Sequence, residues 1–452
     1  MGILPFLSDT PQAEKINTIL TCALPGVLFY FRVMAPHATD ILYTPPPPAR
    51  PQTARAAEAV VGGRYVQLLQ GHLDRLRLAY DHPNRMLHMD TVLTVLLTSF
   101  HDPTVRSLRA VEDLSHCEQL VATQPVERIC RSTLSDALRQ MDSAHLLPVV
   151  GHLMQQLPAL RHQDDDLHAL LKRPLIAADG STFTVPADVL WAIAVTRKNG
   201  AAGRQFRLNL QLDVLRFVPV HLTLSGQGDG SETAAFARDL CSGVVYVADR
   251  NFVDFKFIHA VLGAQSDLVV RLKSDTKFTA AQDRPLTDAD RAAGVVSDRP
   301  GLIKGSAGSP GFGDRVLREV IVADPRTGKS VRLLTSLLDV PARILGLIYR
   351  KRWMIELFFK WLKCVARFRT FSSESPNGIA MQLYVAVIAV LLTYLRTGRR
   401  PGVYTAHCLH WVASGLMTVE TMLKVLEMRE REASLARARL AKKRESAAKK
   451  SV

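Results

Sequence analysis

The first long stretch of periodic apolar residues runs from about residue 54 to residue 160. Apolar side chains recur there at spacings of three and four, as at Leu93 and Leu97. These spacings place side chains on one face of an α-helix, so the pattern predicts a largely helical region. Two short amphipathic segments within it, 107–114 and 132–139, fit either a DNA-reading helix-turn-helix or a plain helical bundle.

Near Leu175 the pattern changes from helical spacing to strands mixed with helices. Alternating positions or short apolar runs predict strands at residues 175–178, 206–213, 217–224, 244–248 and 267–272. Helices are predicted between them at 231–240, where Ser231 is a suitable N-cap, and at 255–262. This mixture predicts an α/β arrangement.

The part after residue 273 is first irregular and then strongly helical. Residues from about 274 to 330 are polar and rich in Gly and Pro, which predicts an insertion made mostly of loop and β-structure. Pro341 then begins one long helix through Lys363, because proline suits the first helical turn. The 13-residue apolar run 383–395 predicts a buried helix, since a membrane span needs about 20 residues.

The two ends of the chain differ from its centre. The apolar run 19–31 is too short to span a membrane and only faintly resembles a signal peptide, so we expect an untargeted leader followed by a proline-rich linker. Residues 424–452 contain ten basic and four acidic residues, which predicts a basic helix that frays.

These patterns together predict four regions. They are a leader and Pro-rich linker at 1–52, a helical region with a DNA-binding option at 53–168, an α/β region at 169–400 with its insertion at 274–330, and a helical C-terminal region with a basic tail at 401–452.

Composition narrows the class of protein. The 452 residues are 47% hydrophobic and 22% charged, which excludes a fibrous or wholly disordered chain. Lysine and arginine total 57 against 42 acidic residues, and the net charge of +15 makes a polyanion such as nucleic acid the first partner to consider. The six cysteines form no CxxC pair, so a zinc ribbon is excluded and a reducing cytosol is indicated.

Two aspartates follow predicted buried strands. Asp179 comes after the run 175–178, and Asp249 comes after the run 244–248. Carboxylates held at the ends of neighbouring strands provide the hard oxygen ligands that Mg²⁺ prefers. Aspartates in such places also form turns, and the sequence pattern alone leaves both interpretations open.

The predicted long helix carries a stripe of functional side chains. At about 100° per residue, most of five polar side chains project from one face of this helix, within a sector roughly 60° wide. The set consists of Tyr349, Arg352, Glu356, Lys360 and Lys363. Aromatic neighbours such as Trp353 predict that the helix is largely buried, which favours a site over a solvated charged face.

The pattern Tyr-x2-Arg-x3-Glu-x6-Lys within residues 347–363 resembles the signature of DDE transposases of the insertion-sequence-four type. Residues 176–181 and 246–252 resemble the two aspartate motifs of the same family, in the same order. Two positions depart from it. Asn251 stands where glycine is usual, and because asparagine tolerates a left-handed backbone we expect this departure to do little damage. Asn209 stands where histidine is frequent.

The resemblance implies an RNase H-like catalytic core with a β-rich insertion, preceded by a helical N-terminal domain. It implies that Asp179, Asp249 and Glu356 hold two Mg²⁺ ions, for which Mn²⁺ is able to substitute. It also implies DNA contacts, made by Tyr349, Arg352, Lys363, Lys360 and Arg250.

The implied activity is cut-and-paste DNA transposition. The implied partner is double-stranded DNA, both transposon ends and target, bound by a homodimer in a bacterial-type cytoplasm at the nucleoid, with no membrane. Two alternatives stay open at this point: an inactive or domesticated DNA-binding relative, and a nuclease that does not transpose.

Overall fold

The computed structural model describes most of the chain after residue 62. The described ranges are 20–24, 27–31, 63–80, 87–100, 107–116, 129–157, 171–196, 200–303, 315–323, 328–364, 372–398, 403–413 and 416–450, with the single residues 105, 167 and 312. Most of the predicted leader and its proline-rich linker lie outside the described residues.

Helices form where the first apolar periodicity predicted them. They are α2 (Gly63–Leu78), α3 (Met89–Phe100), α4 (Leu108–Leu114), α6 (Arg131–Gln140), η1 (Ser143–Leu146) and α7 (Leu147–Gln156). Ser107 caps α4 by accepting a hydrogen bond from the backbone N–H of Ala110, at 3.2 Å. Helices α4 and α6 contact each other, but most of their connection lies outside the described residues, so the helix-turn-helix stays a prediction.

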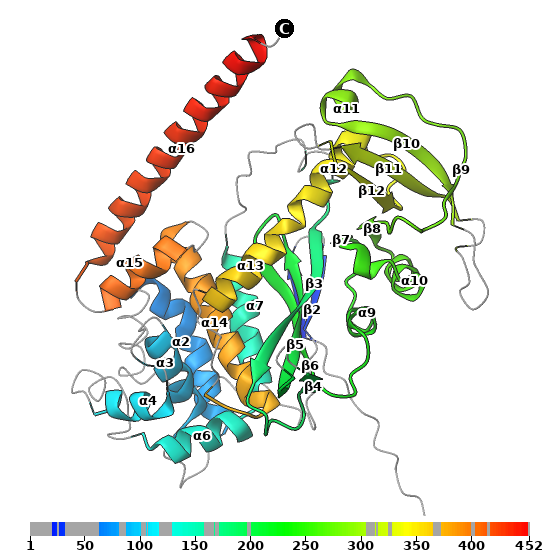
Figure 1. Cartoon of the computed structure of the whole chain (residues 1–452). Helices are drawn as coiled ribbons and strands as arrows, with labels where there is room; N and C mark the ends of the chain where they lie inside the picture. Colours follow the sequence, from blue (N-terminus) through cyan, green and yellow to red (C-terminus); the bar gives the residue numbers. More distant parts are fainter. Residues whose placement is uncertain are drawn as a thin grey trace, which may run out of the picture.

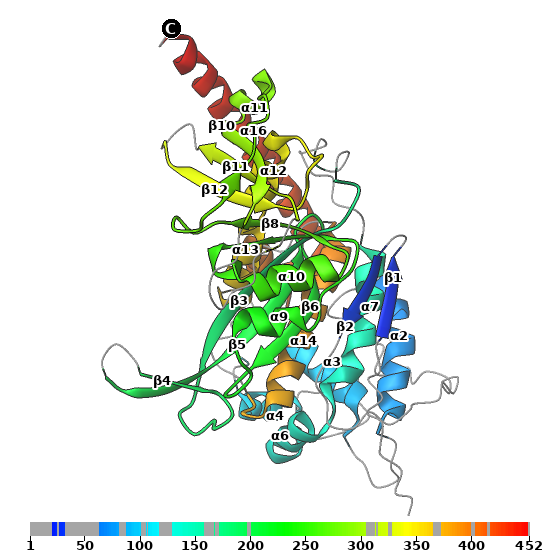
Figure 2. The same ribbon diagram turned by 90° about the vertical axis from the view of Figure 1, so that its right-hand side faces the viewer.

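The apolar run expected to be part of a leader forms a β-hairpin. Strands β1 (Leu20–Leu24) and β2 (Val27–Phe31) pair antiparallel, with Leu20 opposite Phe31. The hairpin lies beside α7 (Figure 2), and β2 also contacts strand β6 (Val218–Ser225).

One large sheet organises the rest of the molecule. Its ten strands are in the order β4-β5-β3-β7-β8-β12-β11-β10-β9, with β6 also paired to β5. The strands not yet located are β3 (Leu175–Val185), β4 (Ile193–Thr196), β5 (Ala202–Asp213), β7 (Val245–Ala248), β8 (Asp267–Arg271), β9 (Thr279–Ala280), β10 (Val295–Leu302), β11 (Leu317–Ala323) and β12 (Ser330–Thr335). The prediction of mixed α/β structure is confirmed.

Strand direction divides this sheet into two parts. Strand β3 runs antiparallel to β5, and β5 runs antiparallel to β6, whereas β7 is parallel to both β3 and β8. The predicted insertion continues the same sheet. Strand β12 pairs antiparallel with β8, β11 pairs with β12, β10 pairs with β11, and β9 pairs with β10. The insertion also contains a short helix, α11 (Asp288–Ala292).

One predicted strand was too short. Strand β3 continues through Asp179 and Gly180 to Val185 and pairs with β5 along that length, so Asp179 lies inside a strand and not at its end. The cause is visible in the burial of Phe183 and Val185, which alternate with exposed threonines and extend the strand past its polar centre.

The helices of this α/β region pack on the sheet, and two of the helices predicted there differ from those found. These helices include α9 (Glu232–Ala237), α10 (Phe255–Gly263), α12 (Ala342–Lys351) and α13 (Trp353–Cys364). Ser231 caps α9 as predicted, but α9 ends at Ala237 instead of Leu240. The prediction of a single long helix was wrong. The chain leaves the α-helical hydrogen-bond pattern at Arg352, whose N–H bonds to the carbonyl of Tyr349 three residues earlier.

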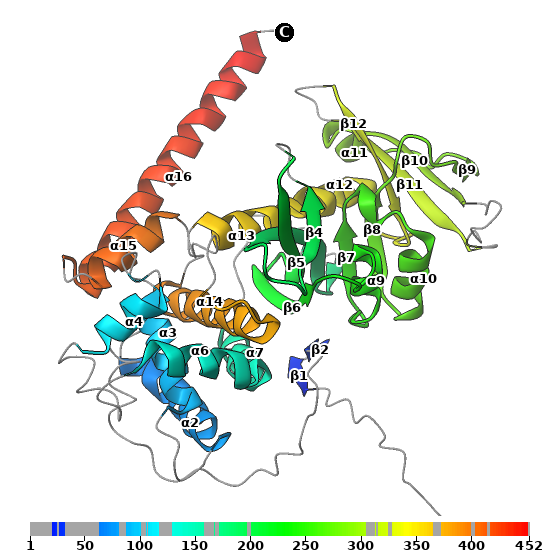
Figure 3. The ribbon, with the colours of Figure 1, turned by 60° about the horizontal axis from the view of Figure 1, so that its bottom comes forward.

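Helix α14 (Pro376–Thr397) is the buried helix that the apolar run 383–395 predicted. It contacts α3, α6 and α7 on one side and β6 on the other, and Figure 3 shows it lying between the helical layer and the sheet. It is the one helix in the described ranges that is long and apolar enough to cross a membrane, but 89% of its apolar window is buried inside the protein.

The chain ends in two further helices. Helix α15 (Val403–Ala413) packs against the start of α16 (Val419–Lys450), and the rest of α16 projects away from the body of the molecule (Figure 1). The expected basic helix is therefore present through Lys450. A single hydrophobic cluster extends from Leu69 in α2 to Tyr394 in α14, so the helical layer and the sheet share one core.

Candidate active site

Two of the three predicted acids lie side by side on parallel strands. The register pairs Ala177 of β3 with Val247 of β7, and Asp179 and Asp249 each come two residues later. Because side chains alternate along strands, residues at equal steps project from the same face. The electrostatic interaction between Asp179 and Asp249 agrees with this placement.

Asp249 is positioned by the turn that follows its strand. It is the N-cap of the short helix η2 (Arg250–Phe252), and its Oδ1 accepts a hydrogen bond of 2.8 Å from the backbone N–H of Asn251. Asn251 is not among the described residues with positive φ, so this position needs no glycine for its backbone conformation here.

A further acid, Glu232 at the start of α9, joins this pair. A Cβ added to Gly180 would lie 2.1 Å from Glu232 Oε1, so the absence of a side chain beside Asp179 makes room for this carboxylate. The sequence pattern at residues 231–240 predicted a helix start here and gave no indication that Glu232 belongs to the site. A glycine directly after Asp179, inside a strand, was the available signal that another group approaches the backbone there.

Arginines on the same side partly compensate these acids. Burial raises the pKa of Glu232, and the negative charge of Asp249 adds to this effect, while the positive charge of Arg207 acts in the opposite direction. Arg207 Nε donates to Asn209 Oδ1 at 2.9 Å, and Asn209 in turn bonds to Ser225 Oγ at 2.7 Å. Asn209 therefore lies one contact away from the acids and orients Arg207.

The balance of charge leaves Asp179 strongly perturbed. Burial is the main cause that raises its pKa to about 7, and the negative charges of Glu232 and Asp249 add to it while Arg352 acts in the opposite direction. Carboxylates so placed favour a proton or a bound cation.

The third predicted acid reaches this group only through an arginine. Glu356 on α13 accepts a hydrogen bond of 2.6 Å from Arg352 Nη2, and Arg352 also interacts electrostatically with Asp179. The Arg352 guanidinium lies 5.8 Å from the ring centroid of Tyr349. Arg352 thus stands between the strand acids and Glu356, at the break between α12 and α13.

The lysines of the predicted stripe separate into two environments. Lys363 Nζ donates to Ser181 Oγ on β3 at 2.7 Å and lies 4.8 Å from the ring centroid of Phe183, so it holds α13 against the strand of Asp179. Lys360 and Arg250 are exposed. Trp353 is 57% exposed, which corrects the expectation of a largely buried helix at this end.

The donor set fits a hard divalent cation in part. Carboxylate oxygens are the ligands Mg²⁺ prefers, and the raised pKa of Asp179 shows negative charge that a cation would relieve. Among the described residues, however, no three His, Cys, Asp or Glu side chains are grouped closely enough to hold a metal together. A three-carboxylate site requires Glu356 to exchange its contact with Arg352 for one with the cation.

Comparison with known proteins places this site within a matched region. Residues 170–392 match the family described as transposase DDE domain. The matched range includes all three predicted acids, the insertion and most of the buried helix α14.

Three curated relatives carry transposase names. A Sinorhizobium fredii protein is 27% identical over 33% of this chain and 42% of its own length, and a Geobacillus stearothermophilus insertion-sequence protein is 32% identical over 17% and 20%. An insertion-sequence protein of Synechocystis is 22% identical over 60% of this chain and 72% of its own length. The chain therefore spans less than half the length of the first two relatives.

Among solved structures, the chain is similar to a piggyBac transposase in a synaptic complex with hairpin DNA. The sequences are 10% identical, the TM-score is 0.40, and the match covers 83% of this chain and 82% of the other.

Proposed function

Because the chain belongs to the DDE transposase family, we propose that it binds the inverted-repeat ends of a transposable element, cuts them and joins them to target DNA. The observation that carries the proposal is the pair Asp179 and Asp249 side by side on parallel strands, with Glu356 one arginine away.

We propose an RNase H-like core for this site. Support comes from the strand order β6-β5-β3-β7-β8, in which an antiparallel meander is followed by two strands parallel to its first strand. In this arrangement the first acid comes from the meander and the second from the first parallel strand.

In the proposed mechanism Asp179, Asp249 and Glu356 hold two Mg²⁺ ions, or Mn²⁺ in their place. When bound, such ions supply Lewis-acid activation of a water or 3′-hydroxyl and stabilise the leaving oxygen at the cut phosphodiester. Asp179 and Asp249 provide the rigid part of the site, because Asp179 lies within β3 and Asp249 is held between β7 and the η2 helix that it caps. Glu356 joins them when Arg352 turns toward DNA.

The cations around the acids are proposed to bind the phosphates of the transposon end. Arg352 Nε is buried and has no hydrogen-bond partner among the described residues, and a phosphate oxygen is the kind of acceptor that it lacks. Arg250, directly after Asp249, and Lys360 on α13 are exposed. Tyr349 lies on α12, and Lys363 lies on α13 with Glu356. A homodimer is proposed because two ends have to be held together for joining.

The test is cleavage and joining of matching end DNA in Mg²⁺. Asp249→Ala should lower the cleavage rate by roughly 10³-fold or more while binding to end DNA stays near that of the wild type. Asp288→Ala, which changes a fully exposed carboxylate on α11, is the matched control and should cut normally.

The same assay separates the alternatives. End binding without cutting by the wild-type protein would identify a non-catalytic relative, and cutting without joining would identify a nuclease. Equal cutting by wild type and Asp249→Ala would remove Asp249 from the site.

A further inference from the structure

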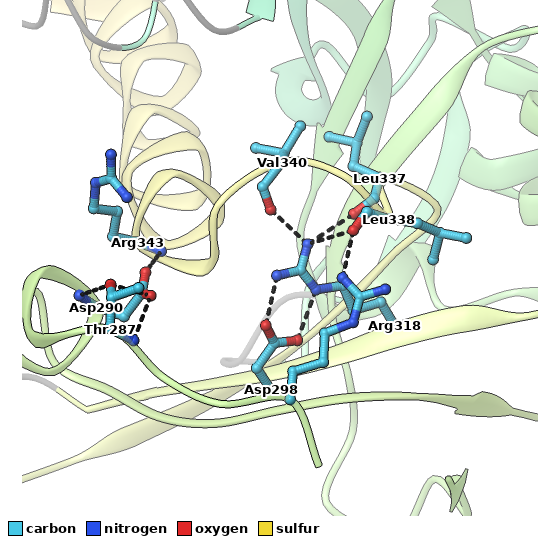
Figure 4. A network of polar contacts seen from close by, with 9 residues as sticks. Thr287, Asp290, Asp298, Arg318, Leu337, Leu338, Val340 and Arg343 are labelled. Atoms are coloured by element: carbon cyan, nitrogen blue, oxygen red, sulfur yellow. Dashed lines mark hydrogen bonds and ion pairs between the residues drawn. The ribbon is translucent and has the colours of Figure 1, made fainter. Parts of the chain in front are cut away.

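The insertion contains a buried arginine that donates hydrogen bonds both to an acidic side chain and to backbone carbonyls outside the insertion. Arg318 on β11 is 2% exposed, and its Nε and Nη2 donate to the two carboxylate oxygens of Asp298 on β10, at 2.7 and 2.6 Å. This bidentate pair joins neighbouring strands of the insertion (Figure 4).

The remaining nitrogen of Arg318 reaches the segment that leads into α12. Its Nη1 donates to the backbone carbonyls of Leu337, Leu338 and Val340, at 3.1, 3.2 and 2.5 Å. Arg284 adds a bond of 2.5 Å to the Leu338 carbonyl. These carbonyls belong to the turn between β12 and α12, so one guanidinium fixes both the insertion and this turn.

A second contact from the insertion holds the first turn of α12. Asp290 of α11 forms a capping box with Thr287, and its Oδ1 accepts a hydrogen bond of 3.0 Å from the backbone N–H of Arg343. The sequence predicted mostly loop and β-structure for this insertion, and not a helix that contacts α12. Arg318 therefore holds the turn that precedes α12 through backbone carbonyls, and Asp290 holds the first turn of α12 through a backbone N–H, as Figure 4 shows.

The helix held in this way carries the site. Helix α12 contains Tyr349, and Arg352 and Glu356 follow directly after it. A shift of about 1 Å in a catalytic group is enough to cost roughly 10²-fold in rate, so the placement of α12 against β7, and of α13 against β3, matters for chemistry.

We propose that Arg318 is a positioning residue, which sets the place of the Tyr349–Arg352–Glu356 segment by clamping the turn at residues 337–340 to the insertion. The inference deepens the proposed function and rests on it for its catalytic part. Stability alone does not call for a buried ion pair, since an apolar pair of similar volume often serves as well or better. A guanidinium is required where one group has to hold a carboxylate and several carbonyls together.

The test separates the clamp from the ion pair. In Arg318→Met/Asp298→Leu, an apolar pair replaces the ion pair and the bonds to the three carbonyls are lost. We expect a melting temperature close to that of the wild type and hydrogen exchange about ten-fold faster or more in residues 337–356, with exchange in β3 and β7 unchanged. Cleavage at saturating end DNA should fall by about ten-fold or more, with DNA affinity within about three-fold.

Two further variants complete the experiment. Arg291→Met/Asp288→Asn removes an exposed ion pair of the same insertion and should change neither exchange at 337–356 nor cleavage. Arg318→Lys keeps the charge but lacks the fork that reaches both partners, so it should show the same local exchange increase, and it serves if the double variant does not fold.

Each outcome decides between the claims. Unchanged exchange at 337–356 in a folded variant overturns the positioning role. So does faster exchange across the whole sheet with normal cleavage per folded molecule, because that result describes a purely structural pair. If the wild type binds end DNA without cutting it while the local exchange increase is seen, the proposed function fails and the clamp stands.

Discussion

The insertion and the acids around Asp179 both contain buried charged side chains. In the insertion these side chains form ion pairs, whereas around Asp179 the negative charges outweigh the positive ones. Glu319, which is fully buried, contacts both Arg299 and Arg332, and Arg318 is paired with Asp298. Around Asp179, three carboxylates share the influence of Arg207 and Arg352, and Asp179 has a pKa of about 7. The difference indicates that each buried charge of the insertion depends on a partner of opposite charge, whereas the excess negative charge around Asp179 is available to a ligand that brings positive charge.

Removing a balanced charge should have the largest effect on stability. Glu319→Gln leaves two arginines facing a neutral amide in a buried position, and we expect the free energy of unfolding to fall by about 3–5 kcal/mol. Urea denaturation followed by circular dichroism measures it. Asp288→Asn, at a fully exposed carboxylate, should change stability by less than about 0.5 kcal/mol. A loss below about 1 kcal/mol for Glu319→Gln would contradict the idea that this charge balance supports the fold.

Removing an unbalanced charge should have the opposite sign. The pKa of Asp179 is raised from 3.8 to about 7 in the folded protein, so the unfolded chain loses this proton at lower pH and stability falls as pH rises from about 4 to about 7. In metal-free buffer at pH 8, Asp179→Asn should therefore stabilise the protein by about 1–3 kcal/mol, with no gain at pH 4.

Thermal unfolding of the wild type and of Asp179→Asn at pH 8 and pH 4 measures this difference in stability. Adding Mg²⁺ gives a second comparison of the two proteins. Added Mg²⁺ should raise the melting temperature of the wild type more than that of Asp179→Asn, because binding to the folded state alone stabilises it. Destabilisation of Asp179→Asn at pH 8 would show that the negative charge is compensated after all.

The contact between Gly180 and Glu232 should give the smallest effect. Gly180→Ala has to displace the Glu232 carboxylate, because its Cβ would lie 2.1 Å from Oε1, and Glu232→Ala removes that obstacle. We expect a coupling free energy of about 1 kcal/mol between the two changes in a double-mutant cycle measured by urea denaturation. Strictly additive effects would mean that the two residues do not meet.

Local patterns predicted those parts that depend on neighbouring residues in the chain. The strand before Asp249, the cap at Ser231 and the buried run 383–395 follow from apolar runs and capping chemistry within a few residues. The family motifs predicted the acids in the same way, because each motif is a short segment.

What the sequence missed depends on contacts between distant segments. Glu232 meets Gly180 only because α9 folds back on β3, and Arg318 meets residues 337–340 only because β11 and β12 pair. The helix break at Arg352 likewise has no proline or glycine at the site to announce it. The continuation of β3 past Asp179 was predictable, since Phe183 and Val185 keep the alternation of a strand.

Helix α14 has a consequence for the order in which the chain is made. Its Asn377 accepts a hydrogen bond from the N–H of Ser143, a residue 234 positions earlier, and its side-chain amide donates to the carbonyls of Leu138 and Met141. At about 5–20 residues per second, the ribosome completes this helix roughly 10–50 seconds after the early helices leave the exit tunnel. During that interval the apolar face that α14 will cover is open to solvent. Nascent chains should therefore engage chaperones until α14 emerges, and translation stopped before residue 376 should leave the early helices without their cover.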